Sequence, residues 1–525
     1  MNLQGHSIIG NTCAVGTGKA GQATNPATGE ILSPDYLEAS DAQVNNAVAK
    51  AAAAFPIYRK IPASDRAAFL RAIAEQIEAQ ADVLAERGPL ETGLPEGRIR
   101  METGRTCGQL RLFAALIENG SWVDARIDNA DPDRQPFPKP DVRSMLQPLG
   151  PVAVFCASNF PLAFSVAGGD TASALAAGCP VIVKAHHSHP GVAEIVGHAV
   201  QTAAQACGMP EGVFSLLYGG GRTVGTALVK HPSIRAVGFT GSLAGGRALM
   251  DIAAARPEPI PVYAEMGSLN PVFVLPGAMA ERGIAIAEGL SGSINMGVGQ
   301  FCTSPGLVVT GEGEDTTQFA HQLAEKQSEA APGVMLNSGI HAAYESSVGQ
   351  LQEHTATEVL ASPAKQEGCL GAPALFKVAA NDFIGDPSLN AEVFGPSTTL
   401  VTHGSREELL ALAQQLEGHL TATVHGTEAD LAAHRDLLDI LETKVGRLIF
   451  NGYPTGVEVC HAMVHGGPYP ATADGRSTSV GTQAIFRFAR PLAYQGFPQS
   501  QLPPELQDAN PLGLARLIDG ERTAG

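Results

Sequence analysis

Cys302 is the residue of this 525-residue chain whose setting most suggests covalent chemistry. It stands in MGVGQFCTSPG, between glycine-rich text and a Pro-Gly turn, and the apolar run LVVT follows. A thiol on a loop ahead of a strand can reach a cleft, and its thiolate is a nucleophile once the thiol pKa is lowered. The sequence does not show that pKa. Taken alone, Cys302 would be interpreted as a small buried structural cysteine.

Three other features that can carry chemistry have weaker support. The eight cysteines are widely scattered and lack the CxxC pairing of a zinc site or the density of a disulfide scaffold. The histidine-rich HHSHP has no cysteine or carboxylate nearby to complete a ligand set, so we expect no metal. GGGRTVG contains a GxGxxxG arrangement, but a glycine cluster alone is a weak dinucleotide signal, and we interpret it as a turn.

A cofactor domain is predicted where strands and helices alternate after Gly150. The runs PVAVFC, PVIVKA, VFSLLY and AVGFTG are separated by helical stretches such as VAEIVGHAVQTAAQA. This alternation indicates parallel βαβ units, which form an open twisted sheet with helices on both faces. Such sheets bind ligands at the carboxyl ends of their strands.

The flanking segments predict helices, an extended arm and a second α/β unit. From about Asp41 to Gly120, apolar positions recur every three or four residues, which predicts amphipathic helices. The four prolines of NADPDRQPFPKPDV, followed by the strand-like VRSMLQPLGP, predict an extended arm. A second α/β pattern begins at Glu265, with strands such as NPVFVL and GLVVTG. The tail STSVGTQAIFRFARPL is strand-like and is expected to pair with the arm, within or between subunits.

Length and composition restrict the class of protein. A chain of 525 residues suggests two or three domains, and 44% hydrophobic with 16% charged residues fits a globular enzyme. The net charge of -18 and the lack of a Lys/Arg run argue against a nucleic-acid partner. The N-terminus has no cationic segment followed by an apolar one, and no window is apolar enough for a membrane span. We predict a cytoplasmic protein without a membrane partner.

Six motifs occur in the order and at the approximate separations of one enzyme superfamily. They are ASNFP, VIVKAHH, FTGSLAGG, AEMGSLNP, GQFCTSPG and EVFGP. Over nearly its whole length the sequence resembles the NAD(P)-dependent aldehyde dehydrogenase superfamily. Within it, HHSHP, GQLRLFA, SVAGGD and GGPYPATADGRSTSVG look most like two groups, the α-ketoglutaric semialdehyde (2,5-dioxovalerate) dehydrogenases and the bacterial NADP-dependent fatty aldehyde dehydrogenases.

The resemblance implies an α/β aldehyde dehydrogenase fold, with a Rossmann-like cofactor domain, an α/β catalytic domain and a small β oligomerisation arm. The expected division is 1–128 and 151–263 for NAD(P) binding, 264–465 for catalysis, 129–150 and 466–500 for the arm and tail, and 501–525 for a C-terminal extension. Because family members exchange strands across a dimer, we expect a homodimer or homotetramer. The candidate pieces are residues 131–147 and 478–488.

Three catalytic residues follow from the resemblance. Cys302 corresponds to the nucleophile that adds to the aldehyde carbon, because hydride leaves readily only from a tetrahedral carbon bearing an oxyanion. Asn159 matches the residue whose amide stabilises that oxyanion together with the backbone N–H at Cys302. Glu265 matches the general base that activates water to hydrolyse the thioester. After Glu265 the chain reads Gly-Ser-Leu-Asn where Gly-Gly-Lys-Ser or Gly-Gly-Lys-Asn is usual, so the local packing is expected to differ.

Further residues match the cofactor site of the family. Lys184, which closes the strand VIVK, matches the lysine that reaches the adenosine ribose. Gly241 and Ser242 open a helix whose N-terminus suits the pyrophosphate. Glu392 and Phe394, in EVFGP, match the pair that hold the nicotinamide half, the carboxylate on the ribose hydroxyls and the ring beside the nicotinamide.

The choice between NAD and NADP depends on His187 and Arg222. NAD-preferring relatives commonly carry a glutamate at the position of His187, where it bonds both ribose hydroxyls and repels a 2′-phosphate. Without that acid, and with Lys184 nearby, a phosphate is tolerated, and Arg222 is able to bind it in a bidentate manner. We therefore expect NADP, with NAD possible. The alternative is that Arg222 is a surface charge at a helix start.

The substrate tunnel is expected to involve aromatic side chains. Phe160 matches a tunnel residue of the family, and Phe301 and Phe450 are predicted neighbours. Residues 167–169, Ala-Gly-Gly, fall where other relatives place a bulky ring, which predicts a roomier tunnel. That room suits a small-molecule aldehyde with a long acyl chain or with a distal carboxylate. The motifs favour α-ketoglutaric semialdehyde, its carboxylate held by an unassigned arginine, over a fatty aldehyde.

Two alternatives keep the fold but change the activity. Acylating relatives pass the acyl group to coenzyme A and lack the general base, so Glu265 argues for hydrolysis. A catalytically silent binding paralogue would not need Cys302, Asn159 and Glu265 together. Both alternatives are therefore disfavoured.

Overall fold

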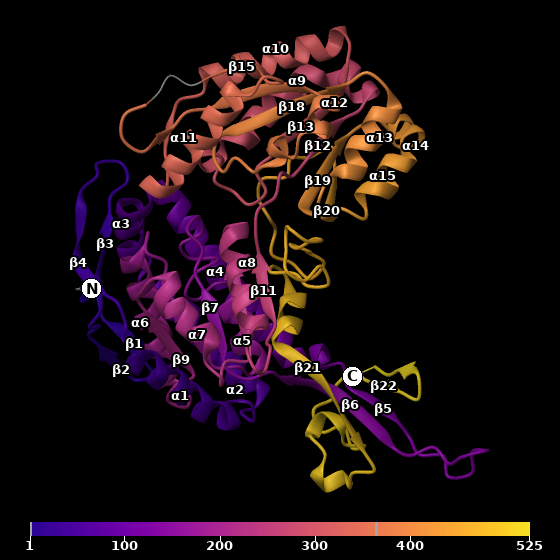
Figure 1. Cartoon of the computed structure of the whole chain (residues 1–525). Helices are drawn as coiled ribbons and strands as arrows, with labels where there is room; N and C mark the ends of the chain where they lie inside the picture. Colours follow the sequence, from indigo (N-terminus) through magenta and orange to yellow (C-terminus); the bar gives the residue numbers. More distant parts are fainter. Residues whose placement is uncertain (1–2, 363–365, 525) are drawn as a thin grey trace.

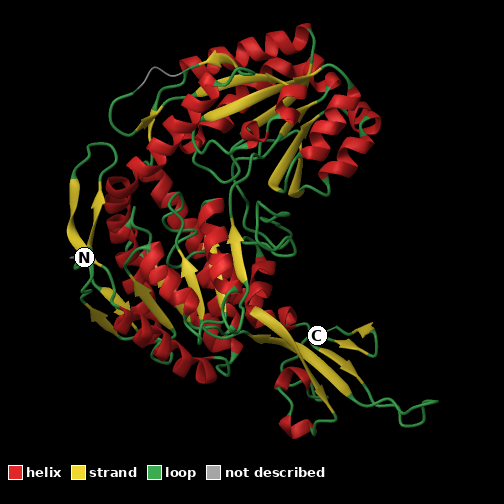
Figure 2. Ribbon diagram, viewed as in Figure 1, coloured by secondary structure: helices red, strands yellow, loops and turns green. Residues whose placement is uncertain are grey.

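Three sheets organise the chain into two lobes and a projecting arm, as the computed structural model shows for residues 3–362 and 366–524 (Figures 1 and 2). The first lobe contains a seven-stranded sheet in which five parallel strands continue into two antiparallel edge strands. In spatial order these are β11 (Val262–Glu265), β10 (Ala236–Thr240), β7 (Val152–Phe155), β8 (Val181–Lys184), β9 (Phe214–Leu217), β1 (Ser7–Ile9) and β2 (Thr12–Ala14).

Helices cover both faces of this sheet, which confirms the predicted doubly wound arrangement. Along β7, Val152 and Val154 join one hydrophobic core, whereas Ala153 and Phe155 join another, because successive strand side chains point to opposite faces. The helices are α1 (Asp41–Tyr58), α2 (Ala63–Glu78), α3 (Ala81–Thr92), α4 (Glu96–Asn119), α5 (Gly169–Ala177), α6 (Pro190–Ala206), α7 (Thr226–Lys230) and α8 (Leu243–Ala254). The predicted helical region from Asp41 to Gly120 corresponds to α1 to α4.

The second lobe is built on another seven-stranded sheet, parallel except for its edge strand β15. In order its strands are β15 (Glu358–Ala361), β17 (Ala374–Ala379), β18 (Ser397–His403), β13 (Leu307–Gly311), β12 (Val272–Val274), β19 (His419–His425) and β20 (Val445–Phe450). Its helices are α9 (Pro276–Asn295), α10 (Glu314–Glu329), α11 (Ser338–Glu353), α12 (Ala380–Gly385), α13 (Arg406–Gln415), α14 (Glu428–Ala433) and α15 (Arg435–Leu441).

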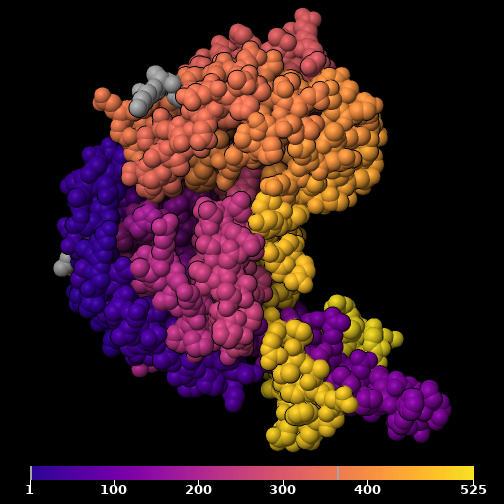
Figure 3. Space-filling view, in the orientation of Figure 1, coloured from indigo at the N-terminus to yellow at the C-terminus, as the bar shows by residue number. Residues whose placement is uncertain are grey.

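A five-stranded sheet forms the arm, which projects from the first lobe (Figure 3). Its order is β21 (Ala489–Gln495), β6 (Val142–Pro148), β5 (Arg126–Asp128), β22 (Leu517–Ile518) and β23 (Glu521–Arg522). The tail pairs with the arm within the chain, since β21 runs antiparallel to β6. Two small antiparallel sheets are also present. One pairs β3 (Ala20–Thr24) with β4 (Ile31–Leu37), and the other pairs β14 (Gly333–Val334) with β16 (Leu370–Gly371).

The prediction of a strand over residues 478–488 is wrong. Thr482–Phe488 forms a 3-10 helix, and the strand begins only at Ala489. Ile485 and Phe488 are buried in the core of the first lobe, and Arg487 pairs with Asp170 at 2.8 Å. Packing against α5 therefore decides the conformation of this segment, and its apolar residues do not face a strand partner.

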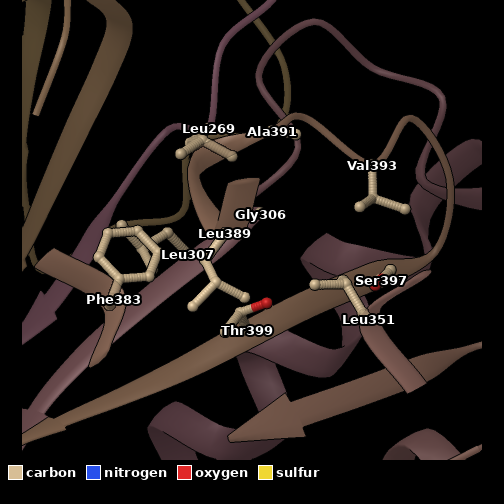
Figure 4. Close-up of a pocket in the computed structure, with 10 residues that line it drawn as sticks. All are labelled: Leu269, Gly306, Leu307, Leu351, Phe383, Leu389, Ala391, Val393, Ser397 and Thr399. Atoms are coloured by element: carbon tan, nitrogen blue, oxygen red, sulfur yellow. The ribbon is translucent and has the colours of Figure 1, made fainter. Parts of the chain in front are cut away.

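A small cavity in the second lobe belongs to the core of that lobe. Among the described residues that line it there is no titratable side chain (Figure 4): Leu269, Gly306, Leu307, Leu351, Phe383, Leu389, Ala391, Val393, Ser397 and Thr399. It therefore offers no acid, base or nucleophile. Among the described helices, none is long and apolar enough to cross a membrane.

Candidate active site

Cys302 lies on a loop that is anchored from two sides. Gly299 has a φ of 65°, and a Cβ atom there would lie 2.1 Å from the carbonyl oxygen of Gly395, so only glycine permits this close approach. From the other side, the Asn270 side-chain amide donates to the carbonyls of Cys302 and Ser304, both at 2.9 Å. The loop that precedes β13 is thus held in place, as its position ahead of a strand predicts.

The unusual Gly-Ser-Leu-Asn segment after Glu265 provides this anchor. Asn270 is fully buried, and its Oδ1 accepts hydrogen bonds from Ser268 at 2.9 Å and from Thr421 at 3.0 Å. The two acceptor contacts orient the amide so that its Nδ2 faces the Cys302 loop. Asn270 also occurs in the common form Gly-Gly-Lys-Asn, so the departure that contributes to this anchor is Ser268, whose hydroxyl orients the Asn270 amide.

Glu265 is buried at the end of β11 and faces Cys302 through a histidine. Its Oε1 lies 2.7 Å from Nε2 of His465, and that nitrogen lies 3.4 Å from Sγ of Cys302. Oε2 accepts a hydrogen bond from the Ser479 hydroxyl. Sequence analysis missed His465, although it belongs to HAMVHGGP, directly before a segment that carries the resemblance.

The hydrogen-bond pattern assigns the proton of the His465 ring to Nε2. Nδ1 is buried and has no partner among the described residues, so a proton there would be an unsatisfied donor. If Nε2 were unprotonated, it would lie 2.7 Å from a carboxylate oxygen with no hydrogen between the two acceptors, which is unfavourable. His465 therefore donates to Glu265 through Nε2, within reach of the Cys302 sulfur.

The surroundings of the site shift the pKa values of Glu265 and Cys302 in opposite directions. Burial by itself raises the pKa of Glu265, but His465 and the Ser479 hydroxyl together outweigh it, so the pKa is lowered and the carboxylate is ionised. Burial, and then the charge of Glu265, raise the pKa of the Cys302 thiol well above its usual value. The nucleophile is therefore a protonated thiol beside an ionised carboxylate that can accept its proton.

Alkylation of Cys302 should report this raised pKa. Below the pKa, the thiolate fraction grows tenfold for each pH unit, so iodoacetamide should label Cys302 in the cofactor-free protein about tenfold faster at each step from about pH 7 to pH 9. The measurement is the rate of Cys302 modification, followed by peptide mass spectrometry. A rate that levels off below about pH 8 would mean that the thiolate is already formed at neutral pH.

Asn159 lies beside Cys302 on the loop that follows β7. Its Nδ2 donates to the carbonyl of Gln300 at 3.0 Å, and its side chain is buried. Glu102 of α4 fixes this loop by accepting the backbone N–H groups of Leu162 and Ala163, both at 2.9 Å. The amide has two N–H donors, so one remains for an oxygen at the reacting carbon.

Aromatic rings surround the approach to Cys302. Phe160 stands edge-on to Phe164 and to Phe301, each with ring centroids 5.3 Å apart, and the Phe164 ring lies 6.2 Å from that of His465. Val457, Val459 and Met463 pack against this aromatic cluster. Together these side chains form an apolar wall next to the thiol.

Two expected tunnel features lie elsewhere. Phe450 is 47% exposed on the edge strand β20 and is not part of the aromatic cluster. Residues 167–169 add no room, since Ala167 is in the core of the first lobe and a Cβ at Gly168 would lie 2.4 Å from the Ala163 carbonyl. Close backbone packing explains the small residues there.

A profile of the aldehyde dehydrogenase family matches residues 15–480. The chain belongs to this family. An α-ketoglutaric semialdehyde dehydrogenase 2 from Azospirillum brasilense is 51% identical over 99% of this chain and 100% of its own length. An α-ketoglutaric semialdehyde dehydrogenase from Acinetobacter baylyi is 46% identical over 94% of both chains.

Solved structures confirm the aldehyde dehydrogenase fold. Aldehyde dehydrogenase C of Pseudomonas syringae, a mutant solved with NAD+ and octanal, superposes with a TM-score of 0.80 at 22% identity, covering 95% of this chain and 98% of its own. A γ-glutamyl-γ-aminobutyraldehyde dehydrogenase from Burkholderia cenocepacia gives a TM-score of 0.81 at 21% identity over 94% and 97%. Membership of the aldehyde dehydrogenase family, together with the two relatives, makes the chain an aldehyde-oxidising oxidoreductase that uses NAD or NADP.

The predicted cofactor residues of this aldehyde dehydrogenase lie on surfaces that fit a dinucleotide. Lys184 ends β8, and burial lowers its pKa. Gly241 and Ser242 are exposed at the start of α8, where open N–H groups suit a pyrophosphate. Glu392 lies against Gly267, where a Cβ would come within 2.5 Å of its carboxyl oxygen, and Phe394 is two residues further on.

His187 and Arg222 are both exposed near this surface. His187 follows β8, and burial of its ring lowers its pKa, so the imidazole is neutral at pH 7. Arg222 lies in the π-helical segment Gly221–Gly225, which leads into α7, where a simple turn was predicted. Neither position carries an acidic side chain that would repel a phosphate.

The catalytic side chains also form a possible metal-ligand set. One donor atom each from Glu265, Cys302 and His465 lies within 4.8 Å of the others. Sulfur, imidazole nitrogen and carboxylate oxygen are the ligands that zinc prefers. A zinc ion bound there would occupy the nucleophile, so the set is compatible with inhibition by metal and not with metal-dependent aldehyde oxidation.

Proposed function

We propose that this aldehyde dehydrogenase oxidises α-ketoglutaric semialdehyde to α-ketoglutarate, with NADP as hydride acceptor and water as acyl acceptor. The observation that carries the chemistry is the convergence of Cys302, Glu265, His465 and Asn159 beside the aromatic cluster. The two relatives at 51% and 46% identity, both named for this semialdehyde, support the substrate.

Oxidation begins when Cys302 adds to the aldehyde carbon. Glu265 takes the thiol proton as the carbon–sulfur bond forms, and the Nε2–H of His465 stabilises the developing thiolate. The amide of Asn159 donates to the oxyanion of the resulting thiohemiacetal. When bound, the nicotinamide cofactor accepts a hydride. Loss of hydride from the tetrahedral carbon leaves a thioester on Cys302.

Hydrolysis of that thioester requires a base. Once its proton has passed to solvent, Glu265 removes a proton from water, which attacks the thioester carbon and releases the acid and the Cys302 thiol. The lowered pKa of Glu265, caused by His465 and Ser479 against the effect of burial, keeps the carboxylate available for this step. Water is thus the proposed acceptor, in place of coenzyme A.

A fatty aldehyde is the second candidate substrate. The wall formed by Phe160, Phe164 and Phe301 is apolar and suits an aliphatic chain. Steady-state kinetics with α-ketoglutaric semialdehyde, hexanal and longer aldehydes, each with NADP and with NAD, decides between the two. A higher kcat/KM for the aliphatic series would overturn the semialdehyde assignment.

The proposed preference for NADP rests on Arg222. Arg222→Ala should raise the KM for NADP roughly tenfold, because a bidentate phosphate contact is lost, and should leave NAD kinetics unchanged. Arg235→Ala is a matched control, since Arg235 is paired with Glu258 at the surface. Unchanged NADP and NAD kinetics in Arg222→Ala would refute the assignment.

We also propose that the protein is a homo-oligomer. β20 and β21 are both edge strands, one of the second lobe and one of the arm. On β20, Leu448 and Phe450 are 40% and 47% exposed. Two edges on a single chain provide matching surfaces for strand pairing between copies, either in a dimer or in a tetramer built from dimers.

A further inference from the structure

The approach to Cys302 contains a half-buried arginine. Arg105 of α4 lies 5.9 Å from the ring centroids of both Phe160 and Phe164. In the described part of the chain, no carboxylate oxygen forms an ion pair with it, and its one hydrogen bond runs from Nη1 to the Val457 carbonyl at 2.8 Å. Glu102 and Glu458 are near enough to favour the charge of Arg105, but neither forms an ion pair with it, so a ligand carboxylate can still bind the guanidinium directly.

The orientation of Arg105 leaves its binding edge available. With Nη1 on Val457, the edge formed by Nε and Nη2 remains, and Nε is buried without a partner. Arginine uses two parallel N–H donors of this kind to bind a carboxylate. Burial lowers the pKa of Arg105, which reflects the cost of keeping this charge away from water.

The neighbouring arginines are already engaged. Arg98, two helical turns before Arg105, forms an ion pair with Glu102 at 3.3 Å and lies over Phe160 and Phe301 at 4.6 and 4.7 Å. Arg447 donates from both terminal nitrogens to the carbonyls of Pro454 and Gly456 and so holds the loop opposite. Arg105 is therefore the cation of this group best placed to receive a carboxylate.

Arg105 lies close enough to Cys302 for its charge to act on that thiol, where it opposes the rise in pKa caused by burial and by Glu265. Phe164 links Arg105 to the reacting atoms, since its ring lies 6.2 Å from that of His465, whose Nε2 is 3.4 Å from the Cys302 sulfur. Four carbon–carbon bonds of about 1.5 Å separate the aldehyde carbon of a five-carbon semialdehyde from its carboxylate, a span of about 5 Å. With its aldehyde at Cys302, such a substrate carries its carboxylate along the aromatic wall toward α4.

We propose that Arg105 binds the distal carboxylate of the substrate and so selects carboxylate-bearing aldehydes over aliphatic aldehydes of the same length. This inference rests on the proposed semialdehyde oxidation and adds the residue that determines its specificity. The aromatic wall holds the carbon chain, while Arg105 recognises its charged end. The bond to Val457 fixes the guanidinium before the substrate arrives.

The test compares α-ketoglutaric semialdehyde with pentanal, which has five carbons and no carboxylate. Arg105→Met should lower kcat/KM for the semialdehyde roughly 30-fold or more, mainly through KM, because a partly buried charge pair is lost. Pentanal turnover should stay within about twofold, since it has no carboxylate to bind. Arg105→Lys keeps the charge but not the paired donors and should give an intermediate loss.

Arg100→Met is the matched control, because Arg100 is exposed on the same helix and pairs with Glu96 and Asp82. It should leave both substrates unchanged. Equal losses for the semialdehyde and pentanal in Arg105→Met, or no loss for either, would overturn the inference.

Failure of the proposed function gives a different result. In that case the wild-type enzyme itself would turn over pentanal better than the semialdehyde. The role of Arg105 is then tested by measuring competitive inhibition by glutarate, a dicarboxylate without an aldehyde. An inhibition constant that rises about tenfold in Arg105→Met supports the carboxylate site, and an unchanged constant refutes it.

Discussion

Replacing Cys302 by alanine should lower kcat for aldehyde oxidation by at least about 10⁴-fold, the scale of loss found when a covalent nucleophile is removed. Without the sulfur no thiohemiacetal forms, and the aldehyde carbon has no tetrahedral state from which hydride can depart. His465 and Glu265 cannot substitute, because they are bonded to one another through Nε2 and Oε1. The measurement is reduced-cofactor formation under saturating aldehyde.

Two controls make the Cys302 result specific. NADP binding, measured by calorimetry, should change by no more than about twofold, because the cofactor residues lie on β8, α8 and the Glu392 loop. Cys460→Ala removes another partly exposed thiol on the loop near the site and should retain full activity. Activity of Cys302→Ala above a few per cent of wild type would exclude the covalent mechanism.

The sequence predicts the sheets of this protein better than its irregular segments. Parallel strands such as β7 and β8 are buried on both faces, so they appear as short apolar runs that periodicity identifies. The segment Thr482–Phe488 also contains a short apolar run, yet it packs as a 3-10 helix against α5. Contacts between distant segments decide that case, and local pattern carries no information about them.

The same limit applies to the site. Motif resemblance selects Cys302, Glu265 and Asn159, and the structure brings them close together, because each stands at the end of a strand or on the loop beside one. His465 lies 200 positions from its partner Glu265, and no spacing rule links the two. The structure does not bring Phe450 to the aromatic cluster, since an aromatic on an edge strand can face either the site or solvent.

Replacing Glu265 by glutamine should separate the two halves of the reaction. Glutamine keeps the shape of the side chain but carries no charge, so the thiolate of Cys302 is no longer disfavoured by a neighbouring carboxylate, and His465 remains to stabilise it. Thioester formation should therefore continue, with solvent accepting the thiol proton in place of Glu265. Hydrolysis loses its base, and we expect a burst of about one equivalent of reduced cofactor per site, followed by turnover slowed about 10²- to 10⁴-fold.

The stalled thioester gives this prediction a second readout. Intact-mass spectrometry after the burst should show an acyl adduct on Cys302, and hydroxylamine should restore turnover by attacking the thioester in place of water. Glu258→Gln is the control, since Glu258 is exposed and pairs only with Arg235 in the described part of the chain. A slow variant without a burst or an adduct would show instead that Glu265 acts mainly by deprotonating Cys302.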